Sequence, residues 1–282
     1  MQLKSNSEDS LISFKIDNTI IYLSVFKQNP QMKKLIICIA FLLVAMQFTN
    51  AQTSKNITTI NQVWLTYNNQ VKFNNKWELV TDFNLRSKEK FVHDLSISIV
   101  RFGITYYLSP ETKLTTGYAW ANYFPGDNHK NISQTEHRPW QQIQWETKHG
   151  KNKLIQWIRL EERFKHKILN DHTLGEGYNF NYRLRLHLRY ELPINKKIIV
   201  PGSLALIISD EVNVNFGKEI INNYFDQNRF FTGFKYQTGV HTSLQFGYLN
   251  IFQQLSAGNQ YKNVNALRAS FYQNIDLSHH FN

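Results

Sequence analysis

Cysteine is almost absent from this chain of 282 residues, and glycine, proline and long apolar runs are scarce as well. The single cysteine, Cys38, has no second thiol to pair with, so a fold held together by internal disulfides is excluded. Twelve Gly and six Pro are too few for a collagen-like or low-complexity chain. No stretch reaches the roughly 20 apolar residues that a membrane-spanning helix needs, so a helical membrane protein is not expected.

Aromatic residues, in contrast, are abundant, with 20 Phe, 14 Tyr and 6 Trp. A disordered chain is thereby excluded, because such chains lack the apolar surface that offsets the entropy lost on ordering. The mean hydropathy of −0.43 is typical of soluble proteins. It is equally typical of membrane barrels, whose polar lumen residues lower the average.

Residues 32–51 have the three parts of a secretory signal: two lysines, an apolar run and a small residue, Ala51, at the end. We predict cleavage after Ala51, which leaves residues 52–282 as the folded domain, a β-barrel without cysteine. Residues 1–31 precede a good start at Met32, and we interpret them as an over-called N-terminal extension. A long, cleaved segment ahead of the apolar run is the alternative.

Apolar and polar residues alternate strictly over residues 180–192, where Phe, Tyr and Leu occupy every second position. A strand places the two sets on opposite faces, whereas a helix would scatter both around its axis. This alternation recurs in segments of about 10 to 16 residues through most of the chain, as in membrane strands with extensions. Further clear examples are residues 77–86, 229–236, 240–248 and 267–272.

Short connections rich in turn residues alternate with longer polar connections, as expected of an outer-membrane barrel with one short and one long rim. The expected long loops are residues 87–93, 125–135, 167–177, 217–223 and 256–263. We count about eleven segments, but bacterial single-chain barrels normally have even numbers of strands. We therefore predict an all-β, antiparallel transmembrane β-barrel of 10 or 12 strands. Either residues 63–73 lie inside it, or residues 198–214 or 263–281 divide into two strands.

Many aromatic residues lie near the ends of the predicted strands, including Trp140 and Trp157, and this predicts aromatic belts at the two membrane interfaces. Core packing is the alternative explanation. Phe281, next to the C-terminus, resembles the signal by which the barrel-insertion machinery recognises outer-membrane barrels. We therefore predict location in the bacterial cell outer membrane, with membrane lipids and lipopolysaccharide as neighbours.

Two stretches, residues 136–142 (EHRPWQQ) and 159–164 (RLEERF), carry a family resemblance together with Trp64 and residues 77–86. They resemble an uncharacterised family of outer-membrane β-barrels common in Bacteroidota and catalogued as a domain of unknown function. The resemblance spans essentially all of the chain after the predicted signal peptide. It implies the fold and a Gram-negative outer-membrane location, and it implies no particular activity.

Charged residues share one face of three successive predicted strands. Pairing about a turn at residues 148–152 places Arg159 near Gln142 and Arg163 near Arg138. Charges facing lipid would be very costly, so we expect these side chains in the lumen, in a paired network. The network is either a selectivity lining for a small anionic solute or a salt-bridged plug that fills a narrow barrel. Its predicted members are Glu136, Arg138, Arg159, Glu161, Arg163, Arg183, Arg185 and Arg189.

No motif for a nucleotide, a catalytic zinc or a nucleophilic serine is present, so we expect no cofactor and favour a structural barrel or narrow pore over an enzyme. An outer-membrane lipid-modifying enzyme of the lipase or deacylase kind is the alternative, with His137 as the outward strand histidine. We expect His166 and His172 to be solvated and to bind no metal. The formal charge of +11 does not indicate nucleic acid, because the basic residues alternate with apolar ones; basic loops beside anionic lipopolysaccharide explain it.

Overall fold

The computed structural model describes residues 11–16, 19–24, 55–88, 94–126, 131–196 and 200–278. The chain divides into two units, Met1–Thr53 and Ser54–Asn282. In the first unit, β1 (Leu11–Ile16) pairs with β2 (Thr19–Ser24) as an antiparallel hairpin. The predicted signal peptide and the C-terminal aromatic lie outside the described residues, so both stay predictions.

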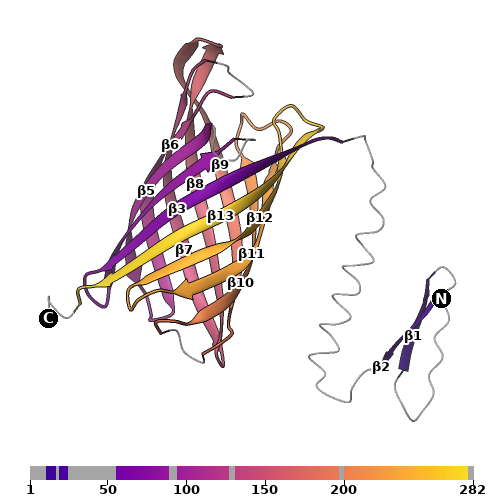
Figure 1. The fold of residues 1–282 in the computed structure, drawn as a ribbon. Coiled ribbons are helices and arrows are strands. Elements are labelled where there is room, and N and C mark those ends of the chain that lie inside the picture. Colours follow the sequence, from indigo (N-terminus) through magenta and orange to yellow (C-terminus); the bar gives the residue numbers. More distant parts are fainter. Residues whose placement is uncertain are drawn as a thin grey trace. The chain divides into compact units, whose positions relative to one another are not determined.

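The second unit is a closed β-barrel (Figure 1). Its eleven described strands are β3 (Asn56–Lys72), β4 (Trp77–Ser87), β5 (Leu95–Tyr107), β6 (Thr112–Tyr123), β7 (Gln134–His149), β8 (Asn152–Asn170), β9 (Thr173–Pro193), β10 (Leu204–Phe216), β11 (Phe225–Gln237), β12 (Thr242–Gln254) and β13 (Gln260–Asp276). The predicted all-β barrel is thereby confirmed. Over the described ranges, no helix is long and apolar enough to cross a membrane.

A parallel pair of strands closes the barrel, where β3 lies beside β13 (Figure 1). Asn56 pairs with Gln260 and Lys72 with Asp276, while every other pair of neighbouring strands in the barrel is antiparallel. The prediction of 10 or 12 antiparallel strands is therefore wrong. It assumed that the first strand starts at the rim where the last one ends, which requires an even number. Here residues 63–73 belong almost entirely to the wall strand β3, and β10 and β13 each remain a single strand.

We name the two rims of the barrel after the chain terminus that lies at each: the start of the first barrel strand or the end of the last. The N-terminal rim is where β3 begins, and it carries the connections β4–β5, β6–β7, β8–β9, β10–β11 and β12–β13. The C-terminal rim is where β13 ends, and it carries the other five connections. The expected loop at residues 167–177 is wrong, because β8 and β9 continue to a two-residue turn and pair Ile168 with Leu174. This hairpin extends beyond its neighbouring strands at the N-terminal rim.

The interior of the barrel is more polar than its exterior. Among the described residues, buried polar and charged side chains outnumber buried apolar ones. On β9, Arg183 and Arg185 are 5% and 7% exposed, whereas Leu186 and Leu188 on the opposite face are 44% and 53% exposed. The alternation read from the sequence therefore places charge inside and apolar side chains outside, the reverse of a water-soluble barrel.

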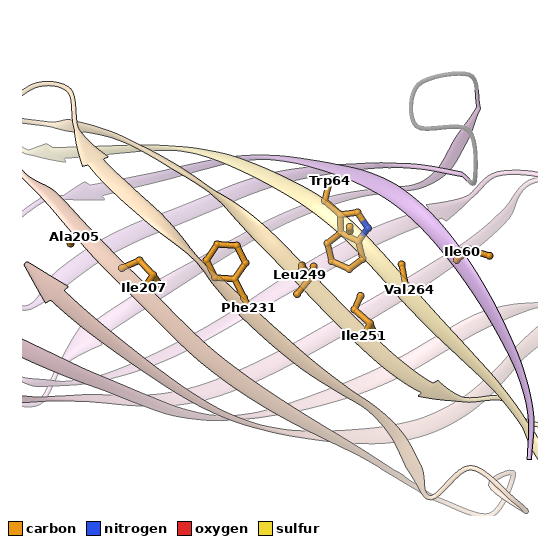
Figure 2. Packing of buried hydrophobic residues seen from close by; sticks show 9 residues of the cluster. Ile60, Trp64, Ala205, Ile207, Phe231, Leu249, Ile251 and Val264 are labelled. Carbon is orange, nitrogen blue, oxygen red and sulfur yellow. The ribbon is translucent and has the colours of Figure 1, made fainter. Parts of the chain in front are cut away.

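One part of the interior is nevertheless apolar (Figure 2). We call it the apolar wall, and it consists of Ile60, Trp64, Ala205, Ile207, Phe231, Leu249, Ile251, Val264 and Ala266 on β10 to β13 and β3. The Phe231 ring lies against a pair of glycines, Gly233 and Gly247, which face each other on β11 and β12. A Cβ on either glycine would come within 3 Å of the Phe231 ring, so the ring fits only because these two residues have no side chain.

A second aromatic ring, on β7, also lies against a pair of facing glycines. Trp140 of β7 is 3% exposed and lies over Gly103 and Gly117, which face each other on β5 and β6. A Cβ on Gly117 would stand 2.6 Å from Trp140 Cζ2. The assignment of Trp140 to an interfacial aromatic belt is therefore wrong, because the missing glycine side chains make room for its ring inside the barrel.

Candidate functional site

Glu136 is the centre of the first interior ion-pair group. It is 0% exposed and accepts hydrogen bonds from Arg138 Nε at 2.7 Å, Arg163 Nη2 at 3.0 Å and the Tyr123 hydroxyl at 2.8 Å. Antiparallel pairing of β7 with β8 brings Glu136 opposite Lys165, and this register carries Arg163 to the carboxylate. Two guanidinium groups on one carboxylate form strong, directional charge-assisted hydrogen bonds.

Glu161 is the centre of a second group, and it is 1% exposed. Arg185 Nη1 lies 2.6 Å from its Oε1, while Arg183 Nη1 and Arg159 Nη1 each lie 3.9 Å from one of its oxygens. Three arginines thus share one carboxylate. A single negative charge cannot compensate three positive ones, so this group needs further carboxylates or keeps a positive potential.

Carboxylates from β10 and β11, which the sequence analysis did not single out, complete this second group. Arg185 Nη2 lies 2.8 Å from Glu211 Oε1, and Arg183 Nη2 lies 2.8 Å from Asp226 Oδ2. Arg229 Nη1 lies 3.4 Å from the same Glu211 oxygen. The alternation of polar and apolar residues on β10 could have predicted that Glu211 faces inward. The outward-facing, charged Asp210 interrupts that alternation, so the prediction was missed.

Arg189 lies apart from the other predicted residues. Its Nη2 is 3.4 Å from Glu191 Oε2, and Lys235 Nζ is 3.2 Å from Glu191 Oε1. The eight predicted residues therefore occur in three interior groups, around Glu136, Glu161 and Glu191. We name the first two groups without Arg159 the charged wall: Tyr123, Glu136, Arg138, Glu161, Arg163, Arg183, Arg185, Glu211, Asp226 and Arg229.

Arg159 is held mainly by aromatic and amide groups. Its guanidinium carbon lies 4.2 Å from the Trp140 ring centroid and 5.1 Å from that of Trp157, and cation–π attraction favours both placements. Its Nε and Nη2 donate to Gln142 Oε1 at 2.9 and 2.7 Å. Arg159 therefore lies near Gln142, where pairing about the β7–β8 turn places it, and its Nη1 is left without a hydrogen-bonded carboxylate.

A cavity of about 240 Å³ opens beside Arg159, in the half of the barrel toward the C-terminal rim. We call it the vestibule. It is polar, with more cationic than anionic side chains around it. Its lining consists of Asn68, Asn69, Gln70, Val80, Thr81, Asp82, Arg101, Lys113, Thr115, Trp140, Gln142, Gln144, Trp157, Arg159 and Tyr272.

His137, the outward histidine of the enzyme alternative, lies on the exterior of β7. The hydroxyl of Tyr118 on β6 is hydrogen-bonded to His137 Nδ1, and the Tyr178 ring lies edge-on with its centroid 5.5 Å from the imidazole. A histidine next to a hydroxyl resembles part of a nucleophilic site, but among the residues that the structure describes no third group orients it. Within the described ranges, no three His, Cys, Asp or Glu side chains come together as a metal site requires.

These features define a closed β-barrel with ion pairs in its interior and apolar side chains on its exterior. Residues 61–262 match the family described as a protein of unknown function (DUF2490), so the chain belongs to this family. The resemblance to a family of unknown function is thereby confirmed, while its outer-membrane and Bacteroidota parts stay predictions. No curated protein and no solved structure matches the chain.

Proposed function

We propose that this protein is an integral barrel of the bacterial outer membrane, and that it is a structural barrel whose lumen is filled by side chains. The observation that carries the proposal is the reversed distribution of polarity, with Glu136 and Glu161 0% and 1% exposed while Phe102 and Phe246 on the exterior are 53% and 58% exposed. A lipid environment makes both placements favourable at once.

The exposed apolar side chains occur on every strand of the barrel wall, so they surround it. Soluble monomers rarely expose contiguous apolar patches beyond a few hundred Å². A protein partner would cover one side of such a surface, whereas a bilayer covers the whole circumference. This distribution supports a membrane in preference to a docking partner.

Filling of the lumen is supported by the burial of the charged wall. Its carboxylates Glu136, Glu161, Glu211 and Asp226 are all less than 9% exposed, and arginines lie between them. Barrels of about eight strands have interiors that side chains can just fill, and in this eleven-stranded barrel the large, paired Arg and Glu side chains of the charged wall fill the interior beyond the vestibule. The plug interpretation is therefore favoured over a narrow pore with an Arg- and Glu-lined channel.

The test is an arginine placed on the exterior. Leu65 lies in the middle of β3, is 50% exposed and pairs with Leu85 and Ala269. In a bilayer, Leu65→Arg should lower the free energy of unfolding by about 2–4 kcal/mol. In water, an exposed substitution of this kind changes stability by no more than about 0.5 kcal/mol.

Leu169→Arg is the matched control, since Leu169 is 72% exposed on the part of the β8–β9 hairpin that extends beyond the neighbouring strands. Both variants are compared by urea unfolding in lipid vesicles. We expect a large effect at Leu65 and a small one at Leu169. Equal small effects, or recovery of the native protein from the periplasm without detergent, would contradict the membrane proposal.

The lipid-modifying enzyme remains a second candidate because Tyr118 and His137 face outward together. Such an enzyme needs a nucleophile and a base within hydrogen-bond reach, oriented for attack on an ester. The reconstituted protein is incubated with phospholipid and lipopolysaccharide, with His137→Gln as the control. Release of fatty acid that the substitution abolishes would favour the enzyme over the structural barrel.

A further inference from the structure

The vestibule contains an arginine whose charge the surrounding carboxylates compensate only weakly. Arg159 Nη1 lies 3.9 Å from Glu161 Oε1, beyond hydrogen-bond distance, and the same oxygen is already bound by Arg185 at 2.6 Å. The other cations of the vestibule differ in this respect. Arg101 is paired with Asp82 at 3.0 Å, and Lys113 with Glu78 at 2.9 Å.

The group behind Arg159 does not supply the missing negative charge. Among the described residues, Arg159, Arg183, Arg185 and Arg229 form ion pairs with three carboxylates, those of Glu161, Glu211 and Asp226. One positive charge is therefore in excess. Because ion pairs in a low-dielectric interior are stable only when both charges are compensated, an external anion that reached Arg159 would be bound favourably.

Neutral hydrogen-bond donors surround this position. The indole N–H of Trp140 is buried and has no hydrogen-bond partner, and its side chain lines the vestibule. This nitrogen has no surface open to the cavity, so the amide groups of the lining are the neutral donors that a ligand in the vestibule could reach. Asn68, Gln70 and Gln144 line the same cavity and carry amide groups that suit hydroxyl groups of a solute.

We propose that the vestibule binds a small, hydroxylated solute with one carboxylate or phosphate group, and that Arg159 binds the oxyanion. The fork of the guanidinium is already partly fixed by Gln142 and the two Trp rings, so little side-chain entropy is lost on binding. The volume of about 240 Å³ restricts the ligand to a small molecule. The inference rests on the interior geometry and does not depend on the membrane proposal.

The experiment titrates the detergent-solubilised full chain with glucuronate, glucose 6-phosphate and neutral glucose, and follows Trp fluorescence. Trp140 and Trp157 both contact Arg159, so an anion bound there should change their emission. We expect a saturable change with at least one of the two anions and none with glucose. The response to each anion separates a carboxylate ligand from a phosphate ligand.

Arg159→Gln should weaken binding by about tenfold or more, because charge-assisted hydrogen bonds contribute more than about 1.4 kcal/mol. Arg268→Gln is the matched control, since it removes the same charge from an interior arginine that lies over Phe231 and outside the vestibule. The Arg268→Gln variant should bind the anions with the same affinity as the unsubstituted protein. Folding of each variant is checked by the shift in gel migration on boiling.

Absence of a saturable response to both anions would overturn the proposal, and so would equal affinity for glucose. Equal affinity of Arg159→Gln and the unsubstituted protein would overturn the role of Arg159. Should the Gln variant fail to fold, Arg159→Lys takes its place, because lysine keeps the charge but loses the fork. Unchanged affinity of that variant would likewise contradict the proposed geometry.

Discussion

The charged wall and the apolar wall fill the same barrel interior by different physical means. In the charged wall, Arg185 joins the carboxylates of Glu161 and Glu211, and each group depends on its partners. In the apolar wall, Leu249 and Ile207 are 2% and 0% exposed and pack against other apolar side chains, with no polar group of their own to pair (Figure 2). Removal of one side chain therefore leaves an uncompensated charge in the charged wall, but only a cavity in the apolar wall.

The largest effect is expected from Glu161→Ala in the charged wall. The substitution removes the carboxylate nearest to Arg185 and leaves three arginines facing less negative charge. Breaking a buried ion pair by deleting one partner costs about 3–5 kcal/mol. Urea unfolding in vesicles should show a loss of this size.

Glu146→Ala is the matched control at the C-terminal rim. Its carboxylate is 23% exposed and lies 3.3 Å from Lys153 and 3.8 Å from Lys148. Exposed pairs contribute less than about 1 kcal/mol. If Glu161→Ala were as mild as Glu146→Ala, the charged wall would not stabilise the barrel as a paired network.

A smaller loss is expected from Leu249→Ala in the apolar wall. Leu249 packs in the cluster with Trp64 and Val264, so its truncation leaves a cavity that the rigid strands can close only in part. We expect about 3 kcal/mol from the same unfolding assay. An effect larger than that of Glu161→Ala would reverse the proposed ranking of the two walls.

Gly117→Ala is expected to cost less again, about 1–3 kcal/mol, by overpacking. The added Cβ would stand 2.3 Å from Phe102 O and 2.6 Å from Trp140 Cζ2, and neither the strand nor the ring can move freely. Gly126→Ala is the control, because a Cβ there meets no atom closer than 3.6 Å. Equal melting temperatures for the two variants would show that the Trp140 ring does not require a residue without a side chain at position 117.

The smallest effect on stability is expected from epitope tags at the two ends of the seam between β3 and β13. A tag immediately before Lys55 lies at the N-terminal rim, and a tag after Ser278 lies at the C-terminal rim. With the C-terminal rim toward the periplasm, antibodies on intact cells should bind only the tag before Lys55. Binding of both tags or of neither would contradict the parallel closure in this orientation.

The sequence predicted the barrel class and the inward face of β7 to β9. The alternation of charged and apolar residues is strict on β9, whereas the outward-facing Gln141 on β7 and Glu162 on β8 interrupt it. It was less informative for the apolar wall, where inward Leu249 and outward Tyr248 are both apolar enough for either face. The strand number was wrong because the direction of β3 depends on its pairing with β13, a contact between distant segments. The vestibule was missed for a similar reason, since its lining comes from seven different strands.

The central claim is that the charged wall closes the lumen, and planar-bilayer conductance tests it most directly. The protein is reconstituted from detergent, and insertion is verified by the heat-dependent gel shift of the recovered protein. We expect no single-channel current, because buried ion pairs fill the interior between the vestibule and the N-terminal rim. Stable, reproducible current steps from the unsubstituted protein would contradict the account and establish a pore.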